Sequence, residues 1–231
     1  MILDLIVLSH NNYEINKIFI QRLKDHTDLS QMRLIWVDNG STDGSVKYLK
    51  NNLPSNHIIS VRETNLGVIN GRNLGWDISN SQEELSKYIM FLDNDQFVGN
   101  GWLDGYLKLA EKYDVIGWEA WKMNNVFLPI CRAKVNEEFS YVGCGGMFLK
   151  REVSDKVGKF DPIFNPSYFE DPDYCMRVYS AGFKITWNKK SNIEHLPHQT
   201  LGKAADKNER FMKSLTAFRK KWSGHKMPVL N

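Results

Sequence analysis

The chain has 231 residues, 42% hydrophobic and 25% charged, so it can bury a large core and its composition is globular, which argues against disorder. Its formal charge of only +3 argues against nucleic acid as the main partner. Cys131, Cys144 and Cys175 are odd in number and lack CxxC spacing, which indicates structural thiols in a reducing compartment and not a disulfide framework or a zinc site.

The N-terminal run MILDLIVLSH predicts a first strand and not a signal peptide. It carries Asp4, has no basic leader and ends its apolar stretch at Leu8. No apolar stretch approaches the ~20 residues that a membrane-spanning helix needs. We therefore expect a cytoplasmic protein whose membrane contact, if it has one, is peripheral at the inner face.

Strands alternate with helices through the first hundred residues, which indicates a mostly parallel sheet. The expected strands are 2–8, 34–37, 57–61 and 87–92, and the expected helices include 15–23 and 46–53. The stretch NLGVINGRNLG is predicted as a glycine-punctuated loop that enters a third helix. Ligands of such sheets bind at the carboxyl ends of the strands, where Ser9, Asp38, Asp93 and Asp95 stand.

Beyond residue 100 the alternation loosens. A helix is expected over 102–113, a strand over 115–121, and further pieces around YVGCGGMFLKREV. Because no linker or repeat separates these pieces, we expect one domain over 1–205. Within it, 1–100 and 101–205 form two halves, of which the second is expected to carry a second substrate, and 206–231 forms a C-terminal helix and tail.

The C-terminal segment is predicted to be an amphipathic basic helix over 208–222. Phe211, Leu215, Phe218 and Trp222 recur at near-helical spacing among lysines and arginines. Packing of this apolar face on the protein's own core and docking on an anionic membrane are both open interpretations.

Two groups of acids stand at predicted strand ends. In FLDNDQ, Asp93 and Asp95 offer hard oxygen ligands suited to Mg²⁺ or Mn²⁺, although aspartate and asparagine also favour ordinary turns. In VDNGSTDGS, helix capping accounts for Ser41 and Asp43 but not for Asp38, which ends a strand in the expected ligand crevice.

The glycines of NLGVINGRNLG permit close approach of the backbone to a ligand, and Arg72 among them is suited to a phosphate. The spacing matches neither the Rossmann nor the Walker motif.

A third acidic group lies in NPSYFEDPDYCMRVYSAGFKITW, before a helix interrupted by Gly182. Two interpretations of Glu170 and Asp171 are open. In the first they simply cap the helix, since acids are common in a first helical turn. In the second, a carboxylate beside the aromatic pair Tyr168 and Phe169 would have its pKa raised towards that of a general base. His195 and His198 follow in IEHLPHQT, and a histidine of this kind is either structural or a ligand.

Taken in order, these segments resemble the family 2, GT-A-fold inverting glycosyltransferases over about residues 2 to 200. The resemblance implies a Rossmann-like α/β/α sandwich with a mostly parallel central sheet, in which 1–100 is the nucleotide-binding half and 101–205 the acceptor-binding half. It also implies an inverting hexosyltransferase of glycan or polysaccharide biosynthesis that uses a nucleotide-diphosphate sugar, Mn²⁺ or Mg²⁺, and a glycan, lipid-linked or other hydroxyl acceptor.

The resemblance also implies a role for each matching residue. Asp171 corresponds to the general base, and Glu170 would assist in the acceptor site. Contacts to the donor are implied for Ser9, Asp38, Arg72 and Asp93. The metal ligands implied by the DxD pattern and the strand-end histidine are Asp95, Asp93 and His195, with His198 as a competitor of His195.

Two rival functions remain at this stage. A nucleotidyltransferase would share the architecture, but the chain has no N-terminal glycine-rich loop with a basic residue to hold a triphosphate. A catalytically silent protein that binds a nucleotide sugar or glycan is the other rival. Four aromatic residues are either sugar-stacking platforms or ordinary core: Trp118, Trp121, Tyr141 and Tyr168.

Overall fold

The computed structural model describes residues 1–53, 57–196 and 206–231. The helices are α1 (Tyr13–His26), α2 (Ser45–Asn52), α3 (Val68–Asn80), α4 (Trp102–Leu109), α5 (Arg151–Val157), α6 (Glu170–Ser180) and α7 (Lys207–Lys221). The first strands are β1 (Leu3–Ser9), β2 (Met32–Asp38), β3 (Ile58–Val61), β4 (Tyr88–Asp93), β5 (Gln96–Val98) and β6 (Val115–Gly117). The remaining strands are β7 (Ala120–Met123), β8 (Pro129–Arg132), β9 (Tyr141–Val142), β10 (Met147–Lys150), β11 (Ile185–Trp187) and β12 (Ile193–His195).

A seven-stranded sheet forms the centre of the molecule, in the order β11-β6-β10-β4-β1-β2-β3. Its strands are parallel except for β10, which runs antiparallel to both β4 and β6. Two small sheets accompany it, β12-β5 and β8-β7-β9. The mostly parallel α/β sandwich predicted from the sequence is confirmed.

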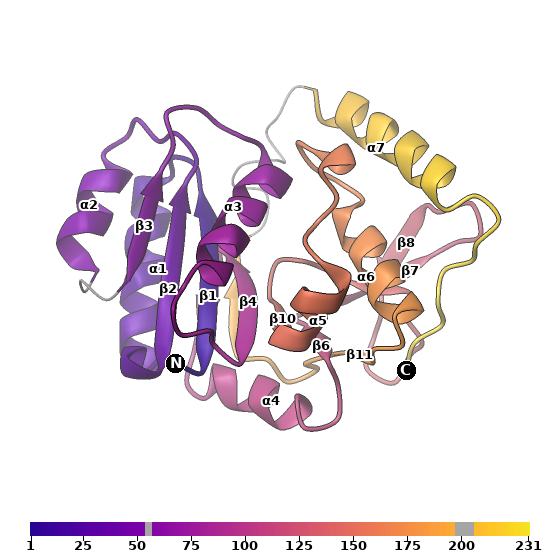
Figure 1. The fold of residues 1–231 in the computed structure, drawn as a ribbon, viewed down its shortest axis with the longest axis horizontal. Coiled ribbons are helices and arrows are strands. Elements are labelled where there is room, and N and C mark those ends of the chain that lie inside the picture. Colours follow the sequence, from indigo (N-terminus) through magenta and orange to yellow (C-terminus); the bar gives the residue numbers. More distant parts are fainter. Residues whose placement is uncertain (54–56, 197–205) are drawn as a thin grey trace.

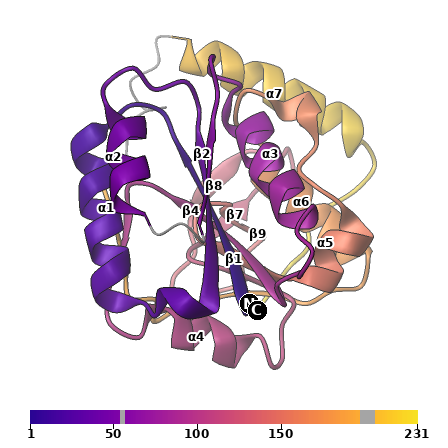
Figure 2. The same cartoon turned by 60° about the vertical axis from the view of Figure 1, so that its left-hand side comes forward.

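Helices cover both faces of the central sheet. Figure 2 shows α1 and α2 on one side of the strands and α3, α5 and α6 on the other. Residues of β1 alternate between the two resulting cores: Leu3, Leu5 and Val7 belong to one, and Ile6 to the other. Burial on both faces explains why this strand reads as a continuous apolar run.

The segment NLGVINGRNLG, predicted as a loop that enters a helix, does enter α3, but the helix already begins at Val68. Gly71 and Gly75 therefore lie inside the helix and not in the loop. A Cβ on Gly71 would lie 2.5 Å from Leu8 Cδ1, and one on Gly75 would lie 2.4 Å from Ile6 Cγ2. These two glycines therefore bring α3 close to β1, so the close approach that they permit is to the sheet and not to a ligand.

Strand register aligns the predicted carboxyl ends. Ser9 of β1 is the partner of Asp38 of β2, and Leu8 is the partner of Asp93 of β4. The side chains singled out at these strand ends thus share one edge of the sheet.

The second half of the chain departs from the predicted elements in detail. The helix expected over 102–113 ends at Leu109, and the strand expected over 115–121 is divided between β6 and β7. Gly182 follows the end of α6 with a φ of +85°, so it terminates that helix and does not interrupt it. Because β6, β10 and β11 join the same sheet as β1 to β4, this half extends the first one, as expected. The domain boundaries at 100 and 205 stay predictions.

The apolar face of α7 packs on the protein itself. Leu215 is 2% exposed and Phe218 is fully buried, with ring contacts to Phe127 and Phe169. In Figure 1 this helix crosses the half of the molecule that carries α6 and β7. Across the described ranges no helix has the length and apolar character needed to span a membrane. A peripheral contact through 208–222 and the cytoplasmic location stay predictions.

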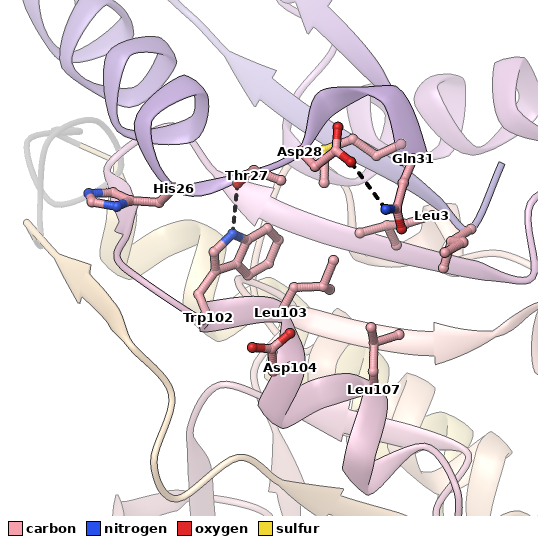
Figure 3. A pocket seen from close by; sticks show the side chains of 12 residues that line it. Leu3, His26, Thr27, Asp28, Gln31, Trp102, Leu103, Asp104 and Leu107 are labelled. Atoms are coloured by element: carbon pink, nitrogen blue, oxygen red, sulfur yellow. Dashed lines mark hydrogen bonds between the residues drawn. The ribbon is translucent and has the colours of Figure 1, made fainter.

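A cavity of about 270 Å³ lies at the amino-terminal ends of β1 and β2, against α4. Figure 3 shows Trp102 donating its indole N–H to Thr27 Oγ1 at 2.8 Å and Gln31 donating to Asp28 Oδ2 at 3.1 Å. This cavity is at the opposite end of the sheet from the predicted ligand edge.

Candidate active site

A cavity of about 370 Å³ opens beside the carboxyl end of β4. Its charged lining comes from α3, β4, the β6–β7 link, the start of α6 and β12: Arg72, Asp93, Glu119, Glu170, Asp171 and His195. Its apolar lining includes Trp118, Met123, Pro129, Tyr141, Tyr168, Phe169 and Phe211. The structure therefore brings five of the predicted site residues together around one space.

Arg72 links two of the acids. Its Nη2 lies 2.6 Å from Asp93 Oδ1 and its Nη1 lies 3.5 Å from Glu170 Oε1. Arg72 lies inside α3 and not in a loop, so the helix holds its backbone in place. The residue is 6% exposed. In this structure the charge that Asp93 places at the strand end is thus balanced by a guanidinium.

Glu170 and Asp171 open α6. The two preceding residues, Tyr168 and Phe169, have φ values of +75° and +68°, and this sharp turn points the first helical residues at the cavity. Asp171 Oδ1 accepts a hydrogen bond from the backbone N–H of Cys144 at 3.0 Å. Glu170 Oε2 is buried with no hydrogen-bond partner in the part of the chain that the structure describes.

Burial raises the pKa values of Glu170 and Asp171. For Glu170 the charge of Asp171 adds to the effect of burial, while Arg72 opposes it. For Asp171 burial outweighs the hydrogen bonds from Cys144 and the charge of Arg72. A carboxyl whose pKa lies above its ordinary value is a better proton acceptor when ionised, which is the property expected of a general base.

Asp95 and His195 meet through the pairing of two short strands. Asp95 lies in the turn between β4 and β5, and antiparallel pairing places His195 opposite Gln96. His195 Nε2 lies 3.4 Å from Asp95 Oδ1, and this hydrogen bond raises the pKa of the imidazole. Two of the three side chains predicted to bind the metal are therefore neighbours.

The third predicted metal ligand, Asp93, is engaged by Arg72. Within the described residues no group of three or more metal-ligating side chains is assembled. A carboxylate and an imidazole together suit a transition ion such as Mn²⁺, whereas Mg²⁺ takes oxygen ligands. Asp95 and His195 thus fit part of a coordination shell whose remaining ligands would come from outside this pair. His198 lies outside the described residues.

Asp38 and Ser9 stand at the sheet edge and are not part of the cavity lining. Asp38 is fully buried; its Oδ1 accepts from the Ser41 N–H at 2.9 Å, and its Oδ2 has no hydrogen-bond partner among the described residues. Ser9 is 3% exposed, and its hydroxyl accepts the Trp36 indole N–H at 2.8 Å. Asp38 therefore has an acceptor to offer, while the Ser9 hydroxyl is used inside the fold.

Asp43 caps α2, as the alternative interpretation held. Its Oδ1 accepts from the Ser45 N–H at 3.1 Å and from the Ser45 hydroxyl at 2.6 Å. Its Oδ2 accepts from the Tyr13 N–H at 2.8 Å. The motif VDNGSTDGS thus divides into a ligand candidate and a structural cap.

Among the polar residues that line the cavity, sequence reasoning did not place Gln96, Glu119 and Cys144 there. Gln96 Oε1 accepts the Asp93 N–H at 2.9 Å and so shapes the β4–β5 turn. Glu119 belongs to no motif, and the signal available for it was an acid within the apolar run around 115–121. Of the four aromatic candidates, Trp118, Tyr141 and Tyr168 line the cavity.

The family model for Glycosyl transferase family 2 matches residues 4–157, more than half of the chain. The chain belongs to this family, and the resemblance stated from the motifs is confirmed. A curated relative, protein y4gI of Sinorhizobium fredii, is 27% identical over 97 residues, which are 41% of this chain and 11% of that protein.

Solved glycosyltransferases share the fold. GalNAc-T7, solved with UDP, GalNAc and Mn²⁺, has a TM-score of 0.76 at 13% identity, covering 97% of this chain and 48% of its own. The Pyrobaculum calidifontis mannosyltransferase PcManGT, solved with GDP-Man and Mn²⁺, has a TM-score of 0.70 at 12% identity, covering 98% and 65%. TarS residues 1–349 from S. aureus has a TM-score of 0.61 at 17% identity, covering 95% and 72%. The chain thus spans less than two thirds of the curated relative, GalNAc-T7 and PcManGT.

Proposed function

We propose that the protein is a metal-dependent, inverting hexosyltransferase. It would move a sugar from a nucleotide-diphosphate donor to an acceptor hydroxyl in glycan or polysaccharide biosynthesis. The observation that carries this proposal is the position of Asp171, a partly exposed carboxylate of raised pKa held by the Cys144 N–H in the cavity that also receives Asp93 and His195.

Asp171 is proposed to accept the proton of the acceptor hydroxyl. The acceptor oxygen then forms its bond to the anomeric carbon on the face opposite the diphosphate, while the bond from that carbon to the diphosphate oxygen breaks. One displacement of this kind inverts the anomeric configuration, as in inverting hydrolysis with an alcohol in place of water. Glu170 would assist in orienting the acceptor.

The charges of the cavity support metal dependence. Its lining carries four carboxyl groups against the single guanidinium of Arg72, so a diphosphate entering alone would be repelled. Asp95 and His195, with Asp93 beside them, would hold a divalent cation. When bound, such a cation neutralises the charge of the leaving diphosphate. GalNAc-T7 and PcManGT, each solved with Mn²⁺, are consistent with this choice.

The donor is proposed to lie along the sheet edge from Asp38 to Arg72. Asp38 Oδ2 is buried without a partner among the described residues, and an acceptor of this kind suits an N–H of the nucleotide base. Arg72 and Asp93 would contact the donor further along. A contact between Ser9 and the donor stays a prediction. Because the Ser9 hydroxyl already accepts a hydrogen bond from Trp36, such a contact would come from the backbone of Ser9 and not from its side chain.

The Asp171→Asn variant tests the role of the base. We expect turnover to fall by ~10²-fold or more, since loss of a general base typically costs that much, while donor affinity stays nearly unchanged. Asparagine retains an oxygen for the Cys144 N–H, so the local structure should hold. Sugar transfer and hydrolysis of nucleotide sugars with Mn²⁺ supply the readout, and Asp155→Asn on the exposed face of α5 is the control. Normal turnover in Asp171→Asn would refute the assignment.

The Asp95→Ala variant tests the metal site. We expect the Mn²⁺-dependent part of UDP and GDP binding to disappear, because a direct ligand of the cation is lost. Calorimetric titration with and without Mn²⁺ measures it, with Asp104→Ala, on α4 at the far end of the sheet, as the control. Equal Mn²⁺-dependent affinities in the variant and the wild type would exclude Asp95 as a ligand.

A further inference from the structure

Glu119 is a carboxylate of the active-site cavity to which the proposed reaction gives no role. It lies between β6 and β7, and its side chain is 20% exposed. The Trp121 indole N–H donates to its Oε1 at 2.9 Å, and Arg132 Nε lies 2.8 Å from its Oε2. Oε2 itself is buried, and in the described part of the chain it makes this ion pair but no hydrogen bond.

The surroundings of Glu119 hold it in one place. The Arg132 guanidinium lies over the rings of both Trp118 and Trp121, at 5.7 and 5.4 Å from their centroids. The hydrogen bond from Trp121 and the ion pair with Arg132 leave the carboxylate little freedom to turn. Burial raises its pKa, and Arg132 opposes that shift.

Glu119 faces both parts of the proposed machinery. It interacts electrostatically with His195 and with Asp171, and all three line the cavity. Opposite it stands Gly143, where a Cβ would lie 3.6 Å from Glu119 Oε1. The missing side chain leaves a small gap next to the carboxylate, and Gly143 and Glu119 both line the cavity.

We propose that Glu119 binds hydroxyl groups of an uncharged sugar acceptor, next to the hydroxyl that reacts; this rests on the proposed function. An ionised carboxylate only accepts hydrogen bonds, so its ligand must present donors, and sugar hydroxyls do so. Trp118 and Tyr141 supply the apolar walls that a sugar ring would contact.

The same residue gives the site a charge preference. Asp93, Glu119, Glu170 and Asp171 surround one space. Arg72 and Arg132 balance only part of their charge, so an acceptor that carries its own carboxylate meets net repulsion. The proposal therefore predicts that the site binds a neutral sugar more tightly than the uronic acid of the same configuration.

Binding of matched glycosides tests the proposal without any turnover. Methyl glycosides of glucose, galactose, mannose and N-acetylglucosamine are titrated into the full chain, and the three hexosides are compared with their methyl uronosides by saturation-transfer NMR. We expect at least one neutral hexoside to bind at least tenfold more tightly than its uronoside. Glu119→Gln should weaken binding of that neutral glycoside about tenfold, because a charged hydrogen-bond acceptor is lost. It should also narrow the difference in affinity between the neutral glycoside and its uronoside.

Gly143→Ala is a second variant that keeps the carboxylate. Its methyl group would make ordinary van der Waals contact with Glu119 and fill the gap beside the carboxylate. We therefore expect glycoside binding to weaken about as much as in Glu119→Gln, with the fold retained. Glu138→Gln, on an exposed glutamate, is the matched control and should bind as the wild type does.

Three results would overturn the inference: no neutral glycoside binds, a uronoside binds as well as its neutral partner, or both variants keep wild-type affinity. None of these depends on donor chemistry. Absence of donor turnover would instead count against the proposed function, so the two failures are distinguishable.

Discussion

At the scale of single residues, the site is a set of acids held close together by few positive charges. Arg72 pairs with Asp93 at 2.6 Å, and His195 approaches Asp95 at 3.4 Å. These contacts explain how a buried strand can end in Asp93 with Asp95 in the turn directly after it. Arg72 reaches Glu170 only at 3.5 Å, and the buried Oε2 of this glutamate has no partner among the described residues. Such an arrangement costs folding free energy and keeps the carboxylates available to a ligand.

The Glu170→Gln variant should be more stable than the wild type, and increasingly so at higher pH. Burial and the charge of Asp171 raise the pKa of Glu170 above its unfolded value, so the folded protein holds this proton more tightly. The protonated carboxyl group makes its full contribution to stability below the ordinary glutamate pKa of about 4.3, and this contribution is lost as the pH rises through the raised pKa. Glutamine has no proton to release, so the variant keeps its stability at high pH.

Urea unfolding at pH 5 and pH 8 measures the effect of Glu170→Gln. We expect a gain that is ~1 kcal/mol or more larger at pH 8 than at pH 5, since one unit of pKa corresponds to about 1.4 kcal/mol. Glu138→Gln, on the surface, should show no such difference. A gain that does not change with pH would contradict a raised pKa at Glu170.

At the scale of elements, α3 shows how one sequence pattern admits two structures. Glycines spaced four residues apart fit a ligand-binding loop and also fit a helix that packs tightly on a strand. Contacts of Gly71 with Leu8 and of Gly75 with Ile6 decide for the helix. Sequence alone could not decide this, because the decisive contacts are with β1, more than sixty positions away.

The helix α7 likewise resolves an open alternative. The periodicity of its apolar residues predicted a helix correctly, but periodicity does not say what covers the apolar face. Phe218 lies among Phe127, Phe164 and Phe169, with ring centroids 5.2 to 6.2 Å apart. This contact with the protein core makes α7 part of the fold.

The Phe218→Ala variant tests the packing of α7. Because Phe218 is fully buried, we expect a loss of about 3–5 kcal/mol in the free energy of unfolding. Met212→Ala, on the same helix and 55% exposed, should change it by no more than about 0.5 kcal/mol. Denaturant unfolding compares the two variants, and equal effects would show that the apolar face of α7 is not packed on the core.

At the scale of the whole molecule, the parts of the fold that could be predicted from the sequence are those that form the parallel half of the central sheet. The parallel half was predictable, because long apolar strands and intervening helices leave a strong periodic signal in β1, β2 and β4. The second half was not, since β6, β7 and β9 are too short for a pattern and β10 runs against its neighbours.

The candidate site divides in the same way. Asp93, Asp95, Glu170 and Asp171 were found because they occupy motifs at element ends. Glu119 reaches the cavity through tertiary contacts that no local spacing records. The pairing of β5 with β12 places His195 beside Asp95, an arrangement that the motif could suggest only by resemblance.

A crystal structure of the full chain with Mn²⁺ and an intact nucleotide sugar tests the central claim most directly. The account predicts Asp95 and His195 on the cation, the diphosphate beside Arg72, and the Asp171 carboxylate facing the anomeric carbon from the side away from the diphosphate. A cation bound elsewhere, or Asp171 remote from that carbon, would contradict it.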